Sequence, residues 1–480
     1  MPLTTPLPAE FVRLIQQLLP EEAEALLGAL EGEASVSVRR NAAKCAALPS
    51  ELPLAGPVAW SQGLGYYLSR RPSFTADPLW HAGQYYVQEA SSMTLAAISP
   101  YLGEEPLVAL DLCAAPGGKS TLLLDLLPAG STLVSNEYVR SRAHILTENL
   151  QKWGPPYSIV TSTDAASLGR MRSSYDLILV DAPCSGEGMM RKDEEARRQW
   201  SPQLVSQCAA LQRSILEDIW PALAPGGLLV YSTCTLNGQE DEAQVAYLVE
   251  ELGAEPLRLQ ALEPFVAPSA LSPYPCYRMM PHRTRGEGLF LALLRKPSAA
   301  GEAKSSHGRK AKGAKAGRSA SVKPPKELLP WLEPSPALQW RMLEETRLLA
   351  LPDPTARLLE ELEALRIPVL SAGLQVAELK GRDWLPQPAL ALSQLLAQEA
   401  FPRVELTRQE CLRYLAGEAL TLPPETPRGF VLICYQGAPL GFAKHLGNRT
   451  NNLYPQPWRI RQLDAVLRRL EESQPEEDVQ

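Results

Sequence analysis

The chain has 480 residues, of which 45% are hydrophobic and 21% charged, and its formal net charge is −7. A chain of this length divides into roughly two to four folded units, and its composition is that of a folded protein rather than a disordered one. No apolar run reaches the ~18 residues of a membrane-spanning helix, and the N-terminal segment lacks the basic and apolar regions of a secretory signal, so a cytoplasmic location is expected.

Residues 1–80 are predicted to form a separate, small α/β domain. From about residue 88 onward, short apolar runs alternate with segments of helical length, which predicts a parallel, doubly wound α/β sheet. The five runs expected to form its buried strands are 107–113, 131–137, 157–164, 175–183 and 227–234.

The first strand leads into a turn of small residues, ALDLCAAPGGKS at 109–120, and a helix is expected to begin near Lys119. Gly117 and Gly118 would let the backbone approach a ligand closely. Acidic residues end the next three strands: Glu137, Asp164 and Asp181. Because ligands of open α/β sheets lie at the carboxyl ends of the strands, this arrangement predicts a nucleoside pocket, and Glu137 has the spacing of a ribose ligand.

Two other nucleotide sites are disfavoured by this turn. A phosphate-binding loop of the Walker type would need glycine where Cys113 stands, although GGKST resembles the end of such a loop. The G-x-G-x-x-G spacing of a dinucleotide fold is absent as well.

The fourth strand is followed by DAPCSGEGMMRKD (181–193), and the fifth ends in TCT (233–235). Strands four and five are commonly neighbours in such sheets, so Cys184 and Cys234 are expected to face one crevice beside the nucleoside pocket. Of the eight cysteines in the chain none forms a C-x-x-C pair, so a zinc ribbon is not expected and no metal is predicted.

Between these motifs, residues 201–223 carry apolar side chains at three- and four-residue steps and predict a helix. Ser201 suits its N-cap and Pro202 its first position, and Pro225-Gly226-Gly227 is expected to end it.

A basic stretch separates the first 298 residues from the C-terminal part. Residues 300–326 carry eight Lys and Arg against one Glu, and they lack the large apolar residues of a core. The stretch is therefore expected to be a linker, and its net charge of +7 would also suit phosphate binding. The predicted division is 1–80, 81–298, a linker at 299–328, an α/β subdomain at 329–398, and a final domain at 399–470.

Taken together, the motifs resemble the NOP/Sun family of RNA cytosine-5 methyltransferases, and are closest to the bacterial RsmF-type ribosomal RNA enzymes. The matching stretches are VQEASSM (87–93), LDLCAAPGGKS (110–120), DAPCSGEGMMRKD (181–193), YSTCT (231–235) with NGQEDEAQV after it, and PHRTRGEGLFLALLRK (281–296). DAPCSGEG combined with STCT is the specific signal.

The resemblance implies a Rossmann-like fold that binds S-adenosylmethionine and methylates carbon 5 of cytosine in 16S ribosomal RNA or the small ribosomal subunit, as a monomer. It assigns Cys234 as the nucleophile and Cys184 as the group that assists product release. Contacts with S-adenosylmethionine are implied for Cys113, Ala114, Ala115, Pro116, Gly117, Gly118, Lys119, Glu137, Asp164 and Asp181. Arg191 and Lys192 are implied to position RNA or the base, or else form a solvated charge cluster.

The implied reaction explains the need for a thiol. Carbon 5 of cytosine is a poor nucleophile until a thiolate adds at carbon 6, and a base must later remove the carbon 5 proton so that the thiol can leave. An acid near ring nitrogen 3 would favour the addition, and Asp181 is the nearest candidate. The spacing alone leaves open which of the two thiols attacks, and an unpaired or flipped-out base is required.

The resemblance also implies RNA binding at both ends of the chain. Residues 35–44 are similar to the family's N-terminal pattern and keep Asn41 and Lys44, with two alanines between them. Residues 379–396 and 429–460 look like its C-terminal PUA-like region, although Gln387-Pro388 replaces the usual Ser-His. The polar residues expected to face RNA, unless they form an ordinary loop, are Lys444, His445, Asn448, Arg449 and Asn451.

Two alternatives of function stay open. The chain could be a ribosome-assembly protein that keeps the fold and acts only by docking, although the acidic strand ends and both cysteines argue for catalysis. It could also carry out the same chemistry on transfer RNA or DNA.

Overall fold

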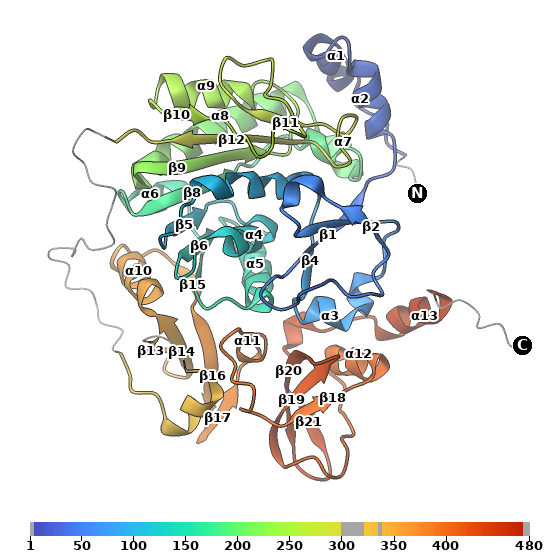
Figure 1. Cartoon of the computed structure of the whole chain (residues 1–480), viewed down its shortest axis with the longest axis vertical. Helices are drawn as coiled ribbons and strands as arrows, with labels where there is room; N and C mark the ends of the chain where they lie inside the picture. Colours follow the sequence, from blue (N-terminus) through green and yellow to red (C-terminus); the bar gives the residue numbers. More distant parts are fainter. Residues whose placement is uncertain (1–3, 299–320, 335–337, 474–480) are drawn as a thin grey trace, which may run out of the picture.

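The computed structural model describes residues 4–298, 321–334 and 338–473. Most of the basic stretch predicted as a linker, residues 299–320, lies outside the described residues. None of the helices in the described part is long and apolar enough to cross a membrane. Figure 1 shows a central sheet with the N-terminal part on one side of it and the C-terminal part below.

The five predicted strands all form, and they run parallel in the central sheet. They are β5 (Val108–Asp111), β6 (Thr132–Asn136), β7 (Ser158–Thr161), β8 (Tyr175–Asp181) and β9 (Leu223–Thr233). Their order is β9-β8-β5-β6-β7, so the fourth and fifth strands are neighbours as expected. The order in which the strands are added to the sheet reverses between β5 and β8, and ligands of such sheets lie outside the carboxyl ends of the strands at this point.

Further strands widen this sheet in the antiparallel sense. They are β12 (Leu289–Arg295), which pairs with β9, β10 (Glu255–Leu257) and β11 (Tyr277–Met279), which pair with β12, and β15 (Val369–Ala372), which pairs with β7. The strand β15 comes from the C-terminal part of the chain, so that part completes the far edge of the central sheet.

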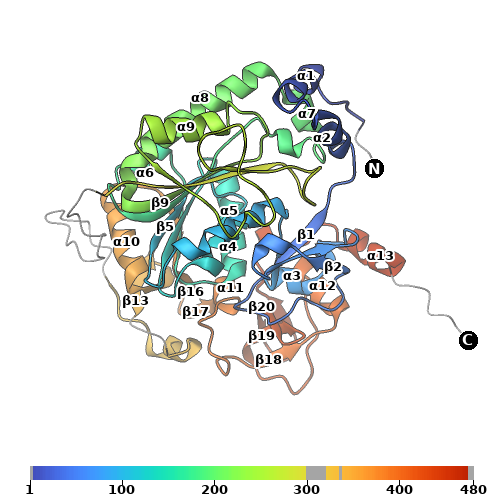
Figure 2. The ribbon, with the colours of Figure 1, turned by 45° about the horizontal axis from the view of Figure 1, so that its top comes forward.

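Helices cover both faces of the sheet, as its apolar strands require. One face packs against η3 (Ser91–Tyr101) and α4 (Gly118–Leu126), and α5 (Arg140–Trp153) packs beside them. The other face packs against α6 (Ala165–Gly169), α8 (Pro202–Ile219), α9 (Glu242–Glu250) and α10 (Asp353–Ala364). In Figure 2 helices α8 and α9 lie side by side on this face. The doubly wound α/β prediction is therefore confirmed.

The helix predicted at 201–223 begins as expected, because the Ser201 side chain accepts a hydrogen bond from the N–H of Leu204 and Pro202 is its first residue. Its predicted end was wrong. The helix stops at Ile219 and continues as a short 3-10 turn, η5 (Trp220–Ala222), and Pro225-Gly226-Gly227 lies inside β9. The register of β8 and β9 shifts at this point, because the strand bulges around these residues.

The N-terminal domain contains helices and one small sheet. Its helices are α1 (Ala9–Leu18), α2 (Ala23–Leu30) and α3 (Pro78–His81). Its strands are β1 (Val36–Arg40), β2 (Leu54–Pro57), β3 (Gly65–Leu68) and β4 (Tyr85–Val87), in the order β2-β3-β1-β4. Helices α1 and α2 pack against α7 (Glu194–Gln199) and its neighbours at the top of Figure 1.

Residues 35–44 join this domain to the central one. Arg39 is fully buried; it forms an ion pair with Asp125 of α4, and its guanidinium lies 4.5 Å from the ring centre of Trp153. Asn41 donates to the carbonyl oxygen of Trp153 (3.0 Å), and Lys44 donates to that of Lys152. Burial lowers the pKa of Lys44 to about 7. These polar side chains are therefore committed to the interface between two domains.

The C-terminal part forms two more four-stranded sheets. The first contains β13 (Leu338–Leu343), β14 (Arg347–Pro352), β16 (Leu374–Lys380) and β17 (Asp383–Pro386), next to η6 (Lys326–Trp331) and α11 (Pro388–Ala391). The second contains β18 (Arg403–Glu405), β19 (Gly429–Tyr435), β20 (Ala438–His445) and β21 (Thr450–Asn452), with helices α12 (Arg408–Ala416) and α13 (Leu463–Ser473). One apolar cluster joins this second sheet to the N-terminal sheet, so the two ends of the described chain pack together.

Candidate active site

The turn between β5 and α4 is shaped by one glycine. Gly117 has φ +114°, a conformation that other residues rarely adopt, and it precedes α4, which begins at Gly118, one residue before the expected Lys119. Two side chains of α5 hold the turn by its carbonyl groups: Arg142 donates to Ala115 (2.9 Å) and Asn149 to Pro116 (2.7 Å). The turn therefore stands fixed at the carboxyl end of the central sheet.

Carboxylates surround this turn. Glu137 directly follows β6, is nearly fully buried, and accepts a hydrogen bond from the N–H of Val139 (2.9 Å). Asp181 ends β8. Burial, with the charges of Asp111, Asp181 and Glu137, raises the pKa of the Cys113 thiol, so Cys113 remains protonated. The three carboxylates are therefore close enough to act on the same thiol. The structure thus brings Cys113, Glu137 and Asp181 together as predicted.

Asp164 lies apart from this cluster. It follows β7, which ends at Thr161, and its side chain is exposed. One of its carboxylate oxygens caps α6 by accepting a hydrogen bond from the N–H of Ser167 (2.7 Å). Its predicted contact with a ligand stays a prediction.

Asp111 belongs to the site and was missed by the sequence reasoning. It ends β5, is fully buried, and accepts a hydrogen bond from the Ser120 hydroxyl (2.7 Å) through one oxygen. Its other oxygen has no hydrogen-bond partner among the described residues. The signal was available, because Asp111 ends the first strand as the other acids end the later ones. An unpartnered buried carboxylate oxygen fits a ligand that carries a positive charge or N–H donors.

Burial raises the pKa of Asp111 from 3.8 to about 7, with Asp181 and Glu137 adding to the rise. The folded state then holds a proton that the unfolded chain has lost, so this group's stabilisation is complete below pH 3.8 and is lost as the pH rises through about 7. We expect Asp111→Asn to remove that loss. Relative to the wild type, the variant should gain roughly 1–4 kcal/mol of unfolding free energy between acidic and neutral pH.

The measurement is urea unfolding of both ligand-free proteins at intervals between pH 4.5 and 8. The quantity compared is the slope of the unfolding free energy against pH in each protein. This slope reports the titration of Asp111, whereas hydrogen bonds that asparagine changes shift the free energy equally at every pH. A constant difference in unfolding free energy across this range would contradict the prediction.

The two predicted thiols meet across the carboxyl ends of β8 and β9. Their sulfur atoms lie 3.2 Å apart, and both side chains are half-buried. Gly188, in the turn that carries Cys184, lets this approach occur: a Cβ atom there would lie 2.4 Å from the carbonyl oxygen of Gly288 and 2.9 Å from that of Cys234. The expectation that Cys184 and Cys234 face one crevice is supported by this geometry.

Lys119 links the thiols to the acidic cluster. Its ammonium group donates to Asp181 (2.8 Å), and the pair is largely buried. Burial alone would lower the pKa of Lys119, but Asp181, Cys234 and Asp111 raise it above its usual value, so it stays charged. Asp181 therefore belongs both to the acidic cluster and to the thiol site.

The surrounding charges make the two thiols unequal. The hydrogen bond that Cys234 shares with Cys184 lowers the pKa of Cys234, and the nearby cations Lys119 and Lys192 act in the same direction, against the opposing effects of burial and Asp181. The same hydrogen bond raises the pKa of Cys184, and burial and the carboxylate of Glu240 raise it further. The structure thus favours a thiolate at Cys234 and a neutral thiol at Cys184, a ranking that the spacing in the sequence left open.

The remaining predicted residues divide into structural and exposed groups. Arg191 donates to the carbonyl oxygens of Gly286 (3.1 Å) and Glu33, so it joins two segments of the chain and has a structural role. Lys192 is exposed. In the C-terminal sheet His445 is buried against Thr450, and Lys444 pairs with Asp383 (3.2 Å). The members that stay exposed are Asn448, Arg449 and Asn451.

Three family models match the chain. Residues 99–295 match the model described as 16S rRNA methyltransferase RsmB/F. Residues 7–90 match the N-terminal domain of 16S rRNA methyltransferase RsmF, and residues 401–460 match the methyltransferase RsmF PUA domain.

Similar proteins are found along nearly the whole chain. The protein named ribosomal RNA small subunit methyltransferase F from Erwinia tasmaniensis is 31% identical, over 94% of this chain and 96% of its own length. The protein of that name from Vibrio parahaemolyticus is also 31% identical, over 94% and 97%. Among solved structures, a methyltransferase homologue from Pyrococcus horikoshii is 27% identical, with a TM-score of 0.51 over 60% of this chain and 94% of its own. The structure of NSun6 from P. horikoshii with SFG, at 20% identity and a TM-score of 0.52, covers 62% of this chain and 100% of its own and supports the fold.

Proposed function

Because the chain belongs to the 16S rRNA methyltransferase RsmB/F family, as its motifs predicted, we propose that it methylates carbon 5 of a cytosine in 16S ribosomal RNA through a covalent adduct with Cys234. The observation that carries the proposal is the pair of unequal thiols, 3.2 Å apart, at the ends of strands where Asp111, Glu137 and Asp181 also lie. A protein that only docks onto the ribosome has no need of this pair.

S-adenosylmethionine is the methyl donor of the family, and the pocket fits it. Its ribose hydroxyls suit Glu137, and its cationic groups suit Asp111, whose buried oxygen lacks a partner among the described residues. The turn from Cys113 through Ala114, Ala115, Pro116 and Gly117 to Gly118 would line the pocket, with Asp164 at the rim. When bound, the donor supplies an electrophilic methyl group.

The reaction begins at Cys234, whose thiolate adds to carbon 6 of the cytosine. The addition makes carbon 5 the nucleophile that the methyl group requires. The charged ammonium group of Lys119 is paired with Asp181 and lies next to Cys234. From there it can stabilise the negative charge that develops on the ring. We assign Asp181 to orient Lys119 and the polar edge of the base, so that the acid expected near ring nitrogen 3 is the Lys119–Asp181 pair rather than Asp181 alone.

Product release reverses the addition. A base takes the proton from carbon 5, the electrons of that bond re-form the 5,6 double bond, and the C6–S bond breaks with its electron pair going to the Cys234 sulfur. The Cys184 thiol donates a hydrogen bond to that departing sulfur and stabilises it as a thiolate. Cys184 is therefore assigned to product release.

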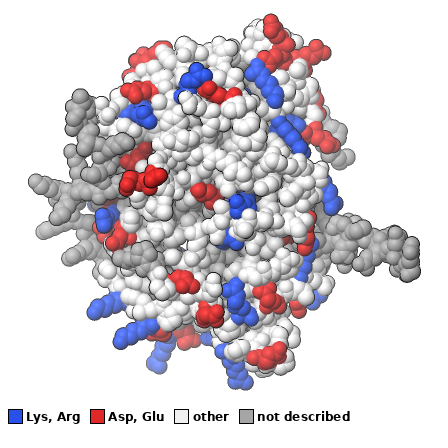
Figure 3. Space-filling view, in the orientation of Figure 1, with Lys and Arg blue, Asp and Glu red and all other residues white. Residues whose placement is uncertain are grey.

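The RNA is expected to contact the C-terminal sheets. In the face shown in Figure 3, Lys and Arg side chains project along the lower edge, over the C-terminal part of the chain. Arg449, Asn448 and Asn451 are exposed in the region that matches the PUA model. Cations of this kind position RNA by its phosphates, whereas the base is read at the thiol site.

The proposal is tested with 16S ribosomal RNA from cells that lack this protein, supplied both naked and within small subunits. Incubation with labelled S-adenosylmethionine, nucleoside digestion and mass spectrometry should find the label in 5-methylcytidine. RNA from cells that contain the protein serves as the control and should take up little label. Label in another nucleoside, or none with either substrate, would overturn the proposal.

A further inference from the structure

The turns that carry the two cysteines are fastened to each other by the residues next to them. The hydroxyl groups of Ser185 and Thr235, each of which follows a cysteine, are 2.9 Å apart. The N–H of Gly188 donates to the carbonyl oxygen of Cys234 (2.9 Å). The 3.2 Å between the sulfurs is thus the outcome of a wider set of contacts between the turns.

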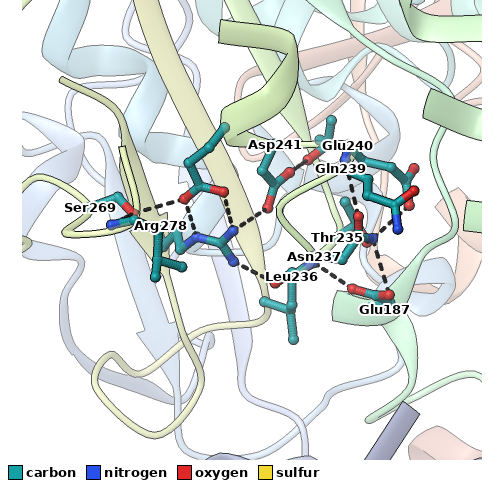
Figure 4. A network of polar contacts seen from close by, with 12 residues as sticks. Glu187, Thr235, Leu236, Asn237, Gln239, Glu240, Asp241, Ser269 and Arg278 are labelled. Carbon is teal, nitrogen blue, oxygen red and sulfur yellow. Dashed lines mark hydrogen bonds and ion pairs between the residues drawn. The ribbon is translucent and has the colours of Figure 1, made fainter. Parts of the chain in front are cut away.

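Two buried carboxylates strengthen this attachment in a reciprocal way. Glu187, from the Cys184 turn, accepts a hydrogen bond from the N–H of Leu236 (2.8 Å), just after Cys234. Glu240, from the segment after Cys234, accepts one from the N–H of Ser185 (2.9 Å), just after Cys184. The amide of Asn237 lies between them and donates to both (3.1 and 2.7 Å), as Figure 4 shows. Both carboxylates are fully buried.

All three hydrogen-bond partners of the Glu240 carboxylate are donors. Besides the N–H of Ser185 and the amide of Asn237, the amide of Gln212 donates to it (2.8 Å), and this amide also donates to the carbonyl oxygen of Pro183 (3.0 Å). Glutamine in place of Glu240 would turn N–H groups toward at least one of these donors. The site therefore requires a carboxylate, and not merely a polar side chain of that shape.

Within the part of the chain that the structure describes, the carboxylate of Glu240 has no paired cation, unlike those of its neighbours. Arg278 pairs with Glu242 and with Asp241 (3.4 Å), as Figure 4 shows. Among the described residues no Lys or Arg forms an ion pair with Glu240. Burying an unpaired charge costs stability unless N–H donors compensate for it. The three donors supply that compensation, and one of them is the N–H of Ser185, so the charge of Glu240 is held against the turn that carries Cys184.

We propose that Glu240, with Glu187 as its reciprocal partner, is a positioning residue that holds the Cys184 thiol against the sulfur of Cys234. Glu240 acts through the backbone of Ser185 and through Gln212, and it touches neither the substrate nor the methyl donor. The proposal rests on the proposed function in one respect only, which is the role of Cys184 in product release. The position of the thiols can be measured without any activity.

The first test measures that position in the ligand-free protein. Diamide oxidises two neighbouring thiols to a disulfide, and peptide mass mapping follows the Cys184–Cys234 bond with time. Glu240→Gln should form it roughly tenfold more slowly, the effect of about one lost charge-assisted hydrogen bond. Removing the negative charge alone would leave more Cys184 as thiolate and speed the reaction, so slowing reports displacement. An unchanged or faster rate would overturn the proposal.

Asp77→Asn is the matched control. Asp77 is also a largely buried carboxyl group with hydrogen bonds, from the Tyr85 hydroxyl (2.5 Å) and the N–H of Leu79 (2.9 Å), but it belongs to the N-terminal domain. Its variant should keep the wild-type oxidation rate, and an equal slowing there would assign the effect to general loosening and overturn the proposal. If Glu240→Gln fails to fold, Glu240→Asp keeps the charge and shortens the reach, and it should oxidise at an intermediate rate.

The second test uses the reaction itself. With 16S ribosomal RNA and S-adenosylmethionine, Glu240→Gln should accumulate the covalent RNA adduct as Cys184→Ala does, whereas Asp77→Asn should not. An adduct in Cys184→Ala but none in Glu240→Gln would overturn the link to product release. If neither variant forms an adduct, the proposed function has failed, and the oxidation rate still decides whether Glu240 positions the thiols.

Discussion

Replacing Cys234 by alanine is expected to lower methyl transfer by on the order of a thousandfold or more, because no other group in the site can form the bond to carbon 6. Cys184, the neighbouring thiol, has a pKa raised by its hydrogen bond with Cys234, by burial and by Glu240, so it is the weaker nucleophile of the two. The measurement is the rate of label transfer from S-adenosylmethionine to 16S ribosomal RNA.

Two further variants make this result specific. Cys234→Ser keeps the size of the side chain but replaces the thiolate by a hydroxyl of much higher pKa, and it should be about as inactive. Cys208→Ala removes another half-buried thiol, on α8, which has no hydrogen bond to either cysteine turn among the described residues, and should keep wild-type activity. Activity in Cys234→Ala within about tenfold of the wild type would show that Cys234 is not the nucleophile.

Replacing Cys184 by alanine is expected to stop the reaction after methyl transfer. The variant loses the hydrogen bond that lowers the pKa of Cys234 but keeps Lys119 and Lys192 beside it, so the addition at carbon 6 should still occur, at a reduced rate. Without the hydrogen bond from Cys184, the departing sulfur is poorly stabilised, and steady-state turnover should fall by roughly a hundredfold or more. A single turnover should remain measurable, and a complex of RNA and protein that resists denaturant should accumulate.

The comparison of the first turnover with later ones separates this role from a general loss of activity. A variant damaged in folding or in RNA binding would lose both together. Equal loss of the first turnover and of steady-state turnover, with no denaturant-resistant complex, would contradict the assignment of Cys184 to release.

The sheet could be predicted from the sequence because its signals are local. Each buried parallel strand is a continuous apolar run, and Gly117 and Gly118 indicate the turn after β5. Apolar side chains at three- and four-residue steps predicted α8, and Ser201 before Pro202 predicted its N-cap. Its end was missed because Pro225 and Gly226 can either stop a helix or bulge a strand, and only pairing with β8 decides between them.

What the sequence could not predict depends on contacts between distant segments. Glu240 lies 55 residues from Ser185 in the chain, and nothing in the local pattern tells it apart from its neighbours Asp241 and Glu242, whose charges Arg278 compensates. The difference in pKa between the two thiols could not be predicted for the same reason. It depends on Lys119 and Lys192 near Cys234 and on Glu240 near Cys184, three residues from separate stretches of the chain.

The segment 35–44 gives the reverse lesson. Its charged and polar residues suggested an RNA surface by resemblance, yet Arg39, Asn41 and Lys44 are turned into the contact between two domains. A polar pattern in a sequence gives the kind of side chain but not its partner, and backbone carbonyl groups satisfy Asn and Lys as well as phosphates do.

The attack of Cys234 is tested most directly by mapping the RNA attachment in Cys184→Ala. After incubation with 16S ribosomal RNA and S-adenosylmethionine, the protein is denatured, digested with nuclease and protease, and analysed by mass spectrometry. The account predicts a methylated cytidine bound to the peptide that contains Cys234. Attachment at any other residue, or no attachment although methyl transfer has occurred, would contradict it.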